Sequence, residues 1–326
     1  MFKHILVPLD GSTRAEGALP ITARIAHAAG SSVVLLQVVS IPPPNYGYGY
    51  GGALGMSYGY GGALGVTSLP SEQVGEREQA EATTYVTRLA DSDLFAGVAT
   101  TTKVVFGQPA PQILALVEQQ EVDLLVLCSH GRTGFLRWVL GSVAQRVIHH
   151  SRVPVLVLRE EGSTPSALRA DAARPFCVAV ALDGSPLAET ALLPAAHLVA
   201  TLAQHTQGAI HLLHVLKPHP SASEREEMEH AQGYLQHVRE HLLAQTSNLN
   251  LLVTWSVTPA QDVAETIITT AEKGVGGESG CDILALATHG HGGIEQWIMG
   301  SVTERVLGAS TVPVLVIRPP QDALHT

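Results

Sequence analysis

Glycines and serines in two similar stretches are the residues of this chain whose spacing could do chemistry. SHGRTGFLRWVLGS spans residues 129–142, and THGHGGIEQWIMGS spans residues 288–301. Glycine adopts positive φ and lets backbone N–H groups approach an anion. The first N–H groups of a helix are unpaired and carry partial positive charge. The pattern therefore predicts phosphate binding, and a glycine turn followed by a serine helix cap is the alternative.

The candidate phosphate-binding residues fall in the turn and at the start of the helix that we expect after it. They are Gly131, Gly134, Gly141, Ser142 and Val143 in the first stretch, and Gly290, Gly293, Gly300, Ser301 and Val302 in the second. Each serine hydroxyl could cap the helix or donate to a phosphate oxygen. Two glycines and a distant Gly-Ser are a weak signal alone, and their occurrence twice at the same spacing strengthens it.

The charges around the glycines differ between the two stretches. The first supplies Arg132 and Arg137, whereas the second has His291 and Gln296 there, beside Glu295. A triphosphate prefers nearby cations, so electrostatics favour the first stretch. The alternative is that both arginines point into solvent and do not contact a ligand.

The repeat extends beyond the glycines to most of the chain. LDGSTRAEGAL from Leu9 resembles LDGSPLAETAL from Leu182, and VPVLVLR from Val153 resembles VPVLVIR from Val312. A length of 326 residues also suggests about two domains of roughly 150 residues. We predict domains at residues 1–160 and 175–319, joined by a linker at residues 161–174 that is rich in Pro, Ser, Ala and charge.

Short apolar runs alternate with segments of helical spacing in both repeats. The runs are HILVPL, SVVLLQVV, TTKVVF, VDLLVLC and VPVLVLR, then CVAVAL, AIHLLHVL, LLVTWSV, CDILALA and VPVLVIR. Strands that are apolar on both faces predict an α/β fold, with a five-stranded parallel sheet covered by helices on both faces in each domain. Pro20 and Pro194 indicate that the first helix of each repeat starts late or is kinked.

The parallel sheet predicts where a ligand would bind. Ligands of open parallel sheets lie outside the carboxyl ends of the strands. Asp10 and Asp183 end the first strand of each repeat, and the glycine stretches follow the fourth. We expect these ends to meet at one crevice in each domain.

A Gly/Tyr-rich insertion at about residues 42–70 interrupts the first repeat. Its Gly47, Gly49 and Gly52 match G-x-G-x-x-G, but that fingerprint must join a strand directly to a helix. We interpret the segment as a flexible insertion, with a lid over the ligand edge as the sharper alternative.

Composition limits the classes of function. A net charge of −10 argues against nucleic-acid binding. No apolar run reaches the ~20 residues of a membrane span, so we predict a cytoplasmic protein that does not bind membranes. We expect Cys128, Cys177 and Cys281 to be reduced packing residues.

The order of these motifs resembles the universal stress protein family in tandem form, over nearly the whole chain. The matching motifs are D-G-S, Q-P-A at residues 108–110 or T-P-A at residues 258–260, S/T-H-G-x2-G, G-S-V and V-P-V-L-V. The resemblance implies a Rossmann-like, adenine nucleotide alpha hydrolase-like fold with sheet order 3-2-1-4-5. It also implies pairing of the two domains through their last strands, and it leaves a homodimer open.

The resemblance further implies that ATP binds, with Mg²⁺ held through its phosphates. Asp10 and Asp183 would hold ribose hydroxyls, and the backbone of Val38 and Val215 would contact adenine; the alternative for each valine is simple core packing. The ATP-binding pattern G-x2-G-x9-G-[S/T] is incomplete, because its first position is Cys128 in one repeat and Ala287 in the other. When the P-A motifs are aligned, Val257 takes the place of Gly107. The larger side chain would add bulk near the expected crevice of the second repeat.

The sequence favours a nucleotide-binding stress or signalling module over an enzyme. It contains no G-x4-G-K-[S/T] motif, no histidine set with metal-ligand spacing, and no identifiable base for ATP hydrolysis. Any turnover of ATP should be slow and incidental. The alternatives are a nucleotide-free universal stress protein that serves pairing or partner binding, and a relative of adenylate-forming enzymes or pyrophosphatases.

Overall fold

The computed structural model describes most of the chain. The residues described are 1–40, 71–129, 140–159, 174–204, 206–218, 224–274, 279–288 and 299–319. The Gly/Tyr-rich insertion and most of the expected linker therefore lie outside the described residues.

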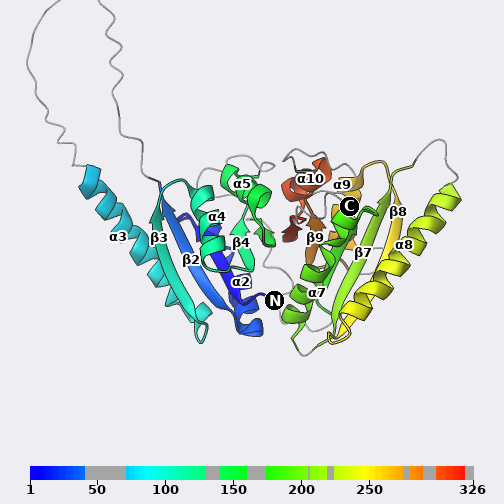
Figure 1. Cartoon of the computed structure of the whole chain (residues 1–326), viewed down its shortest axis with the longest axis horizontal. Coiled ribbons are helices and arrows are strands. Elements are labelled where there is room, and N and C mark those ends of the chain that lie inside the picture. The colour runs from blue at the N-terminus through cyan, green and yellow to red at the C-terminus, as the bar shows by residue number, and fades with distance from the viewer. Residues whose placement is uncertain are drawn as a thin grey trace, which may run out of the picture.

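The two halves of the chain repeat the same order of strands and α-helices (Figure 1). Domain 1 contains β1 (His4–Leu9), α1 (Thr13–Glu16), α2 (Leu19–Ala29), β2 (Ser32–Val39), α3 (Ser71–Ala90), the 3-10 helix η1 (Asp93–Phe95), β3 (Thr100–Phe106), α4 (Pro109–Gln119), β4 (Leu124–Cys128), α5 (Ser142–His150) and β5 (Val155–Leu158). Domain 2 contains β6 (Cys177–Leu182), α6 (Pro186–Glu189), α7 (Leu192–Ala203), β7 (Gly208–Leu216), α8 (Glu224–Gln245), β8 (Leu251–Pro259), α9 (Val263–Lys273), β9 (Ile283–Ala287), α10 (Ser301–Ala309) and β10 (Val314–Ile317).

One continuous sheet runs through both domains in the order β3-β2-β1-β4-β5-β10-β9-β6-β7-β8. The strands are parallel within each domain, which confirms the expected order 3-2-1-4-5, and β5 and β10 pair antiparallel. Figure 1 shows α3 and α8 at the two outer ends of the molecule. The fold is therefore α/β with two Rossmann-like units side by side.

Buried aliphatic side chains fill a layer on each face of the sheet. One layer packs against α1, α2 and α3 with their counterparts α6, α7 and α8, and the other packs against α4, α5, α9 and α10. Leu6 and Leu35, on opposite faces of neighbouring strands, are both 0% exposed. Because helices cover both faces of the sheet, the strand sequences are continuous apolar runs.

The prolines divide the first helix of each domain as the sequence predicted. In domain 1, α1 ends at Glu16 and α2 starts at Leu19, so Pro20 falls in the first turn, where a proline is tolerated. In domain 2, α6 and α7 repeat this break, and α7 starts at Leu192. The short helices α1 and α6 stay close to the ends of β1 and β6.

The strand register corrects the predicted equivalence of Gly107 and Val257. Gln37 pairs with Val104, and its counterpart His214 pairs with Val257. Val257 therefore corresponds to Val104 inside the strand. The backbone N–H groups of Gly107 and Ala260 donate to equivalent carbonyl oxygens on β2 and β7, at 3.0 and 2.9 Å, so Ala260 is the counterpart of Gly107.

The same register separates the two P-A motifs. Pro109 opens α4, whereas Pro259 is the last residue of β8, and α9 starts four residues later at Val263. Helix burial agrees, because Ala110 and Ile113 face the core where Ala264 and Ile267 do in domain 2. The motifs match in letters but occupy different places in the fold.

The prediction that all three cysteines are reduced is wrong for two of them. Cys177 and Cys281 form a disulfide with a Cα–Cα distance of 4.6 Å, although 104 residues separate them. The two residues meet because β6 pairs with β9, which brings the start of β6 beside the residues that precede β9. Cys128 is half-buried and takes no part in this disulfide.

One stretch of the described residues, Pro186–Ala203, is apolar and long enough to be compared with a membrane span. Of this window, 56% is buried within the protein, against β6 and β7. Its apolar side chains therefore serve the core of domain 2.

We expect thiol titration to distinguish the cysteines. Denatured protein that was purified without reductant should expose one reactive thiol, Cys128, and reduction should raise the number to three, because Cys177 and Cys281 are bonded. Alkylation followed by mass spectrometry measures this number. The variant Cys128→Ser is the control and should show no thiol before reduction. Three thiols before reduction would contradict the disulfide.

Candidate functional site

The carboxyl ends of three neighbouring strands form the candidate site in domain 1. β1 lies between β2 and β4, so Val38, Asp10 and Cys128 stand at or just beyond adjacent strand ends. In domain 2, β6 lies between β7 and β9 and places Val215, Asp183 and Ala287 in the same way. This edge is where open parallel sheets bind ligands.

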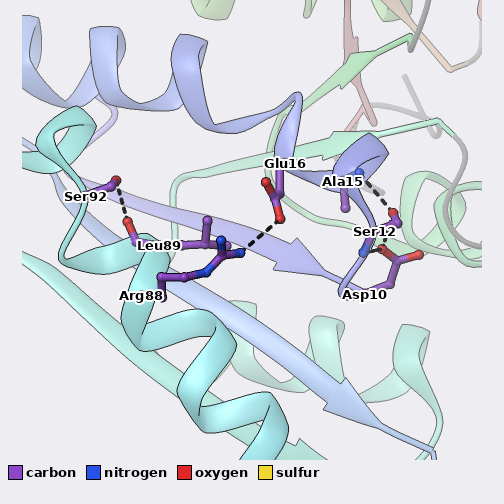
Figure 2. Close-up of polar contacts among 7 residues, drawn as sticks. All are labelled: Asp10, Ser12, Ala15, Glu16, Arg88, Leu89 and Ser92. Atoms are coloured by element: carbon purple, nitrogen blue, oxygen red, sulfur yellow. Dashed lines mark hydrogen bonds and ion pairs between the residues drawn. The ribbon is translucent and has the colours of Figure 1, made fainter.

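A tight turn fixes Asp10 directly after β1 (Figure 2). The Oδ1 atom of Asp10 accepts hydrogen bonds from the backbone N–H of Ser12 at 3.0 Å and from its hydroxyl at 2.6 Å. The Ser12 hydroxyl in turn accepts from the N–H of Ala15 and caps α1. Gly11 permits the turn, because its φ of +84° is strained for other residues.

Domain 2 repeats this turn with the same geometry. Asp183 accepts from the N–H and hydroxyl groups of Ser185 at 3.0 and 2.6 Å, and Ser185 caps α6. Both carboxylates are half-buried and held in one orientation before any ligand arrives. A carboxylate positioned in this way is an acceptor ready for hydroxyl donors.

The glycine stretches are described at their ends only. Gly131, Arg132, Gly134, Gly290 and Gly293 lie outside the described residues, as do Arg137, His291, Glu295 and Gln296. The N–H of Gly141 donates to the carbonyl of Ser129 at 2.8 Å, and that of Gly300 donates to Thr288 at 3.0 Å. One hydrogen bond therefore closes the base of each stretch and holds the helix start beside the end of β4 or β9.

Helix α5 begins at a glycine, which has no side chain to cap the helix. Gly141 is its N-cap residue, and its first internal hydrogen bond runs from Gln145 to Gly141. The N–H groups of Ser142, Val143 and Ala144 consequently have no acceptor within the helix. Such a helix start binds anions through its N–H groups and its dipole.

Helix α10 begins in the same way, with Gly300 as its N-cap residue and no side-chain cap. A Cβ atom at Gly300 would lie 3.3 Å from the Thr288 carbonyl oxygen, so this position is tight for any larger residue. Ser301 and Val302 form its first turn, as Ser142 and Val143 do in α5. Because both serines are the first helical residues and are exposed, their hydroxyls do not cap these helices.

The side chain of Cys128 packs toward α1. Its Sγ atom lies 3.8 Å from the carbonyl oxygen of Ala15, and a Cβ atom at Gly17 would come within 3.5 Å of it. Ala287 occupies the same place in domain 2 and is 7% exposed. The larger residue at the first position of the glycine pattern is therefore accommodated under α1.

The next two strand ends place the residues expected near adenine. Val38 and Val215 are half-buried and pack against the core layer on the side of α4 and α9. Gly107 follows β3 with a φ of +137°, a conformation that favours glycine. Ala260 occupies that position in domain 2, so the two domains differ in backbone beside the expected base.

A tyrosine that the sequence patterns did not predict lies close to each aspartate turn. The Tyr234 hydroxyl donates to Glu189 at 3.1 Å, and the Tyr234 ring meets the His214 ring edge-on with centroids 6.0 Å apart. His214 also contacts the Leu182 carbonyl oxygen at 3.0 Å. Burial, followed by the charges of Glu189 and Asp183, raises the pKa of Tyr234.

The equivalent residues of domain 1 are arranged differently. Among the described residues, the buried Tyr85 hydroxyl and the Gln37 Oε1 atom have no hydrogen-bond partner. The Oε1 atom of Glu16 forms an ion pair with the Nη2 atom of Arg88 at 3.6 Å (Figure 2). Burial, followed by Glu16, raises the pKa of Tyr85. The amphipathic pattern of α3 and α8 could have placed these tyrosines toward the core, but not beside the aspartate turns.

A duplicated, doubly wound α/β protein is the class that this fold defines. The model of the "Universal stress protein family" matches residues 1–159 and 178–318. The chain belongs to the universal stress protein family, and it carries the family's domain twice.

Several known proteins are similar to this chain. A universal stress protein of Methanocaldococcus jannaschii is 32% identical over 160 residues, which are 49% of this chain and 84% of the relative. A universal stress protein of Mycobacterium tuberculosis strain H37Rv is 26% identical over 323 residues, 98% of this chain and 96% of the relative. The crystal structure of a universal stress protein from Archaeoglobus fulgidus shares the fold, with a TM-score of 0.67, 19% identity, and coverage of 98% of this chain and 99% of that one.

The two tyrosines allow a matched test of the difference between the domains. Tyr234→Phe should lower the free energy of unfolding by about 1–2 kcal/mol, because it removes the hydrogen bond to Glu189. Tyr85→Phe should change it little or raise it, because the hydroxyl that it removes has no partner among the described residues. Urea denaturation measures both values. Equal losses in the two variants would contradict this account of the two turns.

Proposed function

We propose that this protein binds adenine nucleotide, ATP in particular, and serves as a stress-response or signalling module. The observation that carries the proposal is the start of α5. Its N-cap residue, Gly141, has no side chain to cap the helix, and its N–H donates to Ser129 at the strand edge that bears Asp10. Phosphates would accept from the N–H groups of Ser142 and Val143. Asp10 would accept from the ribose hydroxyls, and the backbone of Val38 would contact adenine.

Domain 1 is the preferred nucleotide site in this proposal. Gly107 at its expected adenine edge corresponds to Ala260 in domain 2, and Arg132 and Arg137 flank its glycines where domain 2 has no arginine. These cations matter because the chain carries a net charge of −10, which opposes the approach of a triphosphate.

Mg²⁺ would arrive with the phosphates in this proposal. The described residues hold no cluster of three or more His, Cys, Asp or Glu side chains that could bind a metal ion. Metal coordination would then come mainly from the nucleotide and water, as is usual for Mg²⁺.

Binding without strong catalysis is part of the same proposal. Hydrolysis needs a base positioned beside the terminal phosphate. Asp10 is held by Ser12 at the edge proposed for ribose, so we assign it a role in binding only.

We place the protein in the cytoplasm.

A second candidate function is pairing or partner binding without nucleotide. The observation that favours it is the antiparallel pairing of β5 with β10, in which Leu156 and Leu315 face each other at 0% exposure. In this version the duplicated fold itself is the functional unit, and assembly of two chains would use other surfaces.

Nucleotide content and binding decide between these two functions. We expect protein purified from cells to release adenine nucleotide on heating, and the emptied protein to bind ATP with magnesium in calorimetry. Chromatography of the released material identifies the base. Protein that is empty as purified and also fails to bind ATP would leave the pairing function.

A matched pair of glycine variants tests which domain binds. Gly141→Val should weaken ATP binding about tenfold or more, because a branched side chain disturbs the helix start that holds the phosphates. Gly300→Val should change the affinity less than about twofold if domain 1 holds the nucleotide. Calorimetry gives the affinities, and thermal unfolding of both variants controls for misfolding. Equal losses would disprove the preference for domain 1.

A further inference from the structure

Two arginines cross the boundary between the domains at equivalent positions. Arg159 directly follows β5, and its Nη1 atom donates to the carbonyl oxygens of Gly308 at 2.9 Å and Ser310 at 3.3 Å. Arg318 directly follows β10, and its Nη1 atom donates to the carbonyl oxygen of His150 at 3.3 Å. Each arginine therefore contacts the C-terminal end of a helix in the opposite domain.

The helices that receive these contacts are the ones whose starts face the candidate sites. α5 runs from Ser142 to His150, and α10 runs from Ser301 to Ala309 with Ser310 as its C-cap. The last carbonyl groups of a helix lack internal donors and carry partial negative charge. An arginine there satisfies a carbonyl and fixes the end of the helix.

The arginines are also connected to the sites of their own domains. The carbonyl of Leu158, next to Arg159, accepts from the N–H of Ser129 at 2.7 Å. The carbonyl of Ile317, next to Arg318, accepts from the N–H of Thr288 at 2.8 Å. Ser129 and Thr288 in turn hold Gly141 and Gly300.

These hydrogen bonds join into one closed circuit. The start of α5 is bonded to Ser129, which connects through Leu158 to Arg159, and Arg159 contacts the C-terminal end of α10. The start of α10 is bonded to Thr288, which connects through Ile317 to Arg318, and Arg318 contacts the C-terminal end of α5. The circuit depends on the antiparallel pairing of β5 and β10, which brings each strand end beside the helix of the other domain.

We propose that Arg318 and Arg159 are positioning residues for the candidate phosphate sites, each acting on the helix of the opposite domain. Arg318 holds α5 so that its first N–H groups face the ligand of domain 1, and Arg159 does the same for α10 in domain 2. The link to phosphate rests on the proposed function, whereas the positioning of the two helices does not.

Two matched variants, Arg318→Met and Arg159→Met, test this in the full chain. Without nucleotide, Arg318→Met should speed hydrogen exchange of amides in α5 about fivefold and leave α10 unchanged. Arg159→Met should speed exchange in α10 and leave α5 unchanged. Arg318→Lys keeps a cation beside the last turn of α5 and should restore most of the protection there. Exchange that rises equally in both helices, or in neither, would overturn the proposal, because a general loosening of the interface has no preference for one helix.

Calorimetry then connects the arginines to binding. Arg318→Met should weaken ATP binding by about threefold to fivefold, and Arg159→Met by less than about twofold, if domain 1 holds the nucleotide. An unchanged affinity in Arg318→Met would overturn the role of Arg318 at the phosphate site. If the unmodified protein binds no ATP, the proposed function fails, and the exchange pattern alone decides the positioning role.

Discussion

The antiparallel pairing of β5 with β10 is the contact on which the rest of the structure depends. Each strand has four residues, all buried, so each would be an exposed apolar edge without the other. Pairing converts two half-sheets into one sheet whose outer edges are β3 and β8. Because both strands belong to one chain, they meet at a high effective concentration that does not depend on how much protein is present. The helices at the centre, α5 and α10, are thereby fixed relative to each other.

The fold could be predicted from the sequence because its signals are local and occur twice. Apolar runs such as SVVLLQVV and CVAVAL coincide with β2 and β6, and Pro20 marks the first turn of α2 as expected. The alignment of Gly107 with Val257 was wrong because matching letters do not fix a register. The register of β8 follows from its pairing with β7, where Val257 lies opposite His214, and the strand then continues through Pro259. The disulfide of Cys177 and Cys281 depends likewise on which strands are neighbours.

The candidate site could be predicted only in part. The aspartates and the helix-start glycines occur at strand and helix ends, where a pattern of residue types has a direct structural meaning. Tyr85 and Tyr234 belong to the site for a different reason, since α3 and α8 return across the sheet and bring residues distant in sequence to the aspartate turns. The pattern of a helix predicts which residues face the core, but it does not say what they meet there. Residues 130–139 and 289–298 lie outside the described part of the chain, so the roles of Gly131 and Gly290 stay predictions.

The aspartate turns and the helix starts have the same geometry in both domains and do not distinguish their sites. Asp10 and Asp183 accept the same hydrogen bonds at the same distances, and α5 and α10 both begin at a glycine without a side-chain cap. A difference in nucleotide affinity must therefore come from the surroundings, such as Gly107 against Ala260. Such local differences affect the affinity for an anionic ligand strongly in this protein, because its net charge of −10 opposes the approach of the ligand. If domain 1 holds the nucleotide as proposed, domain 2 would contribute to binding chiefly by holding α5 in place through Arg318.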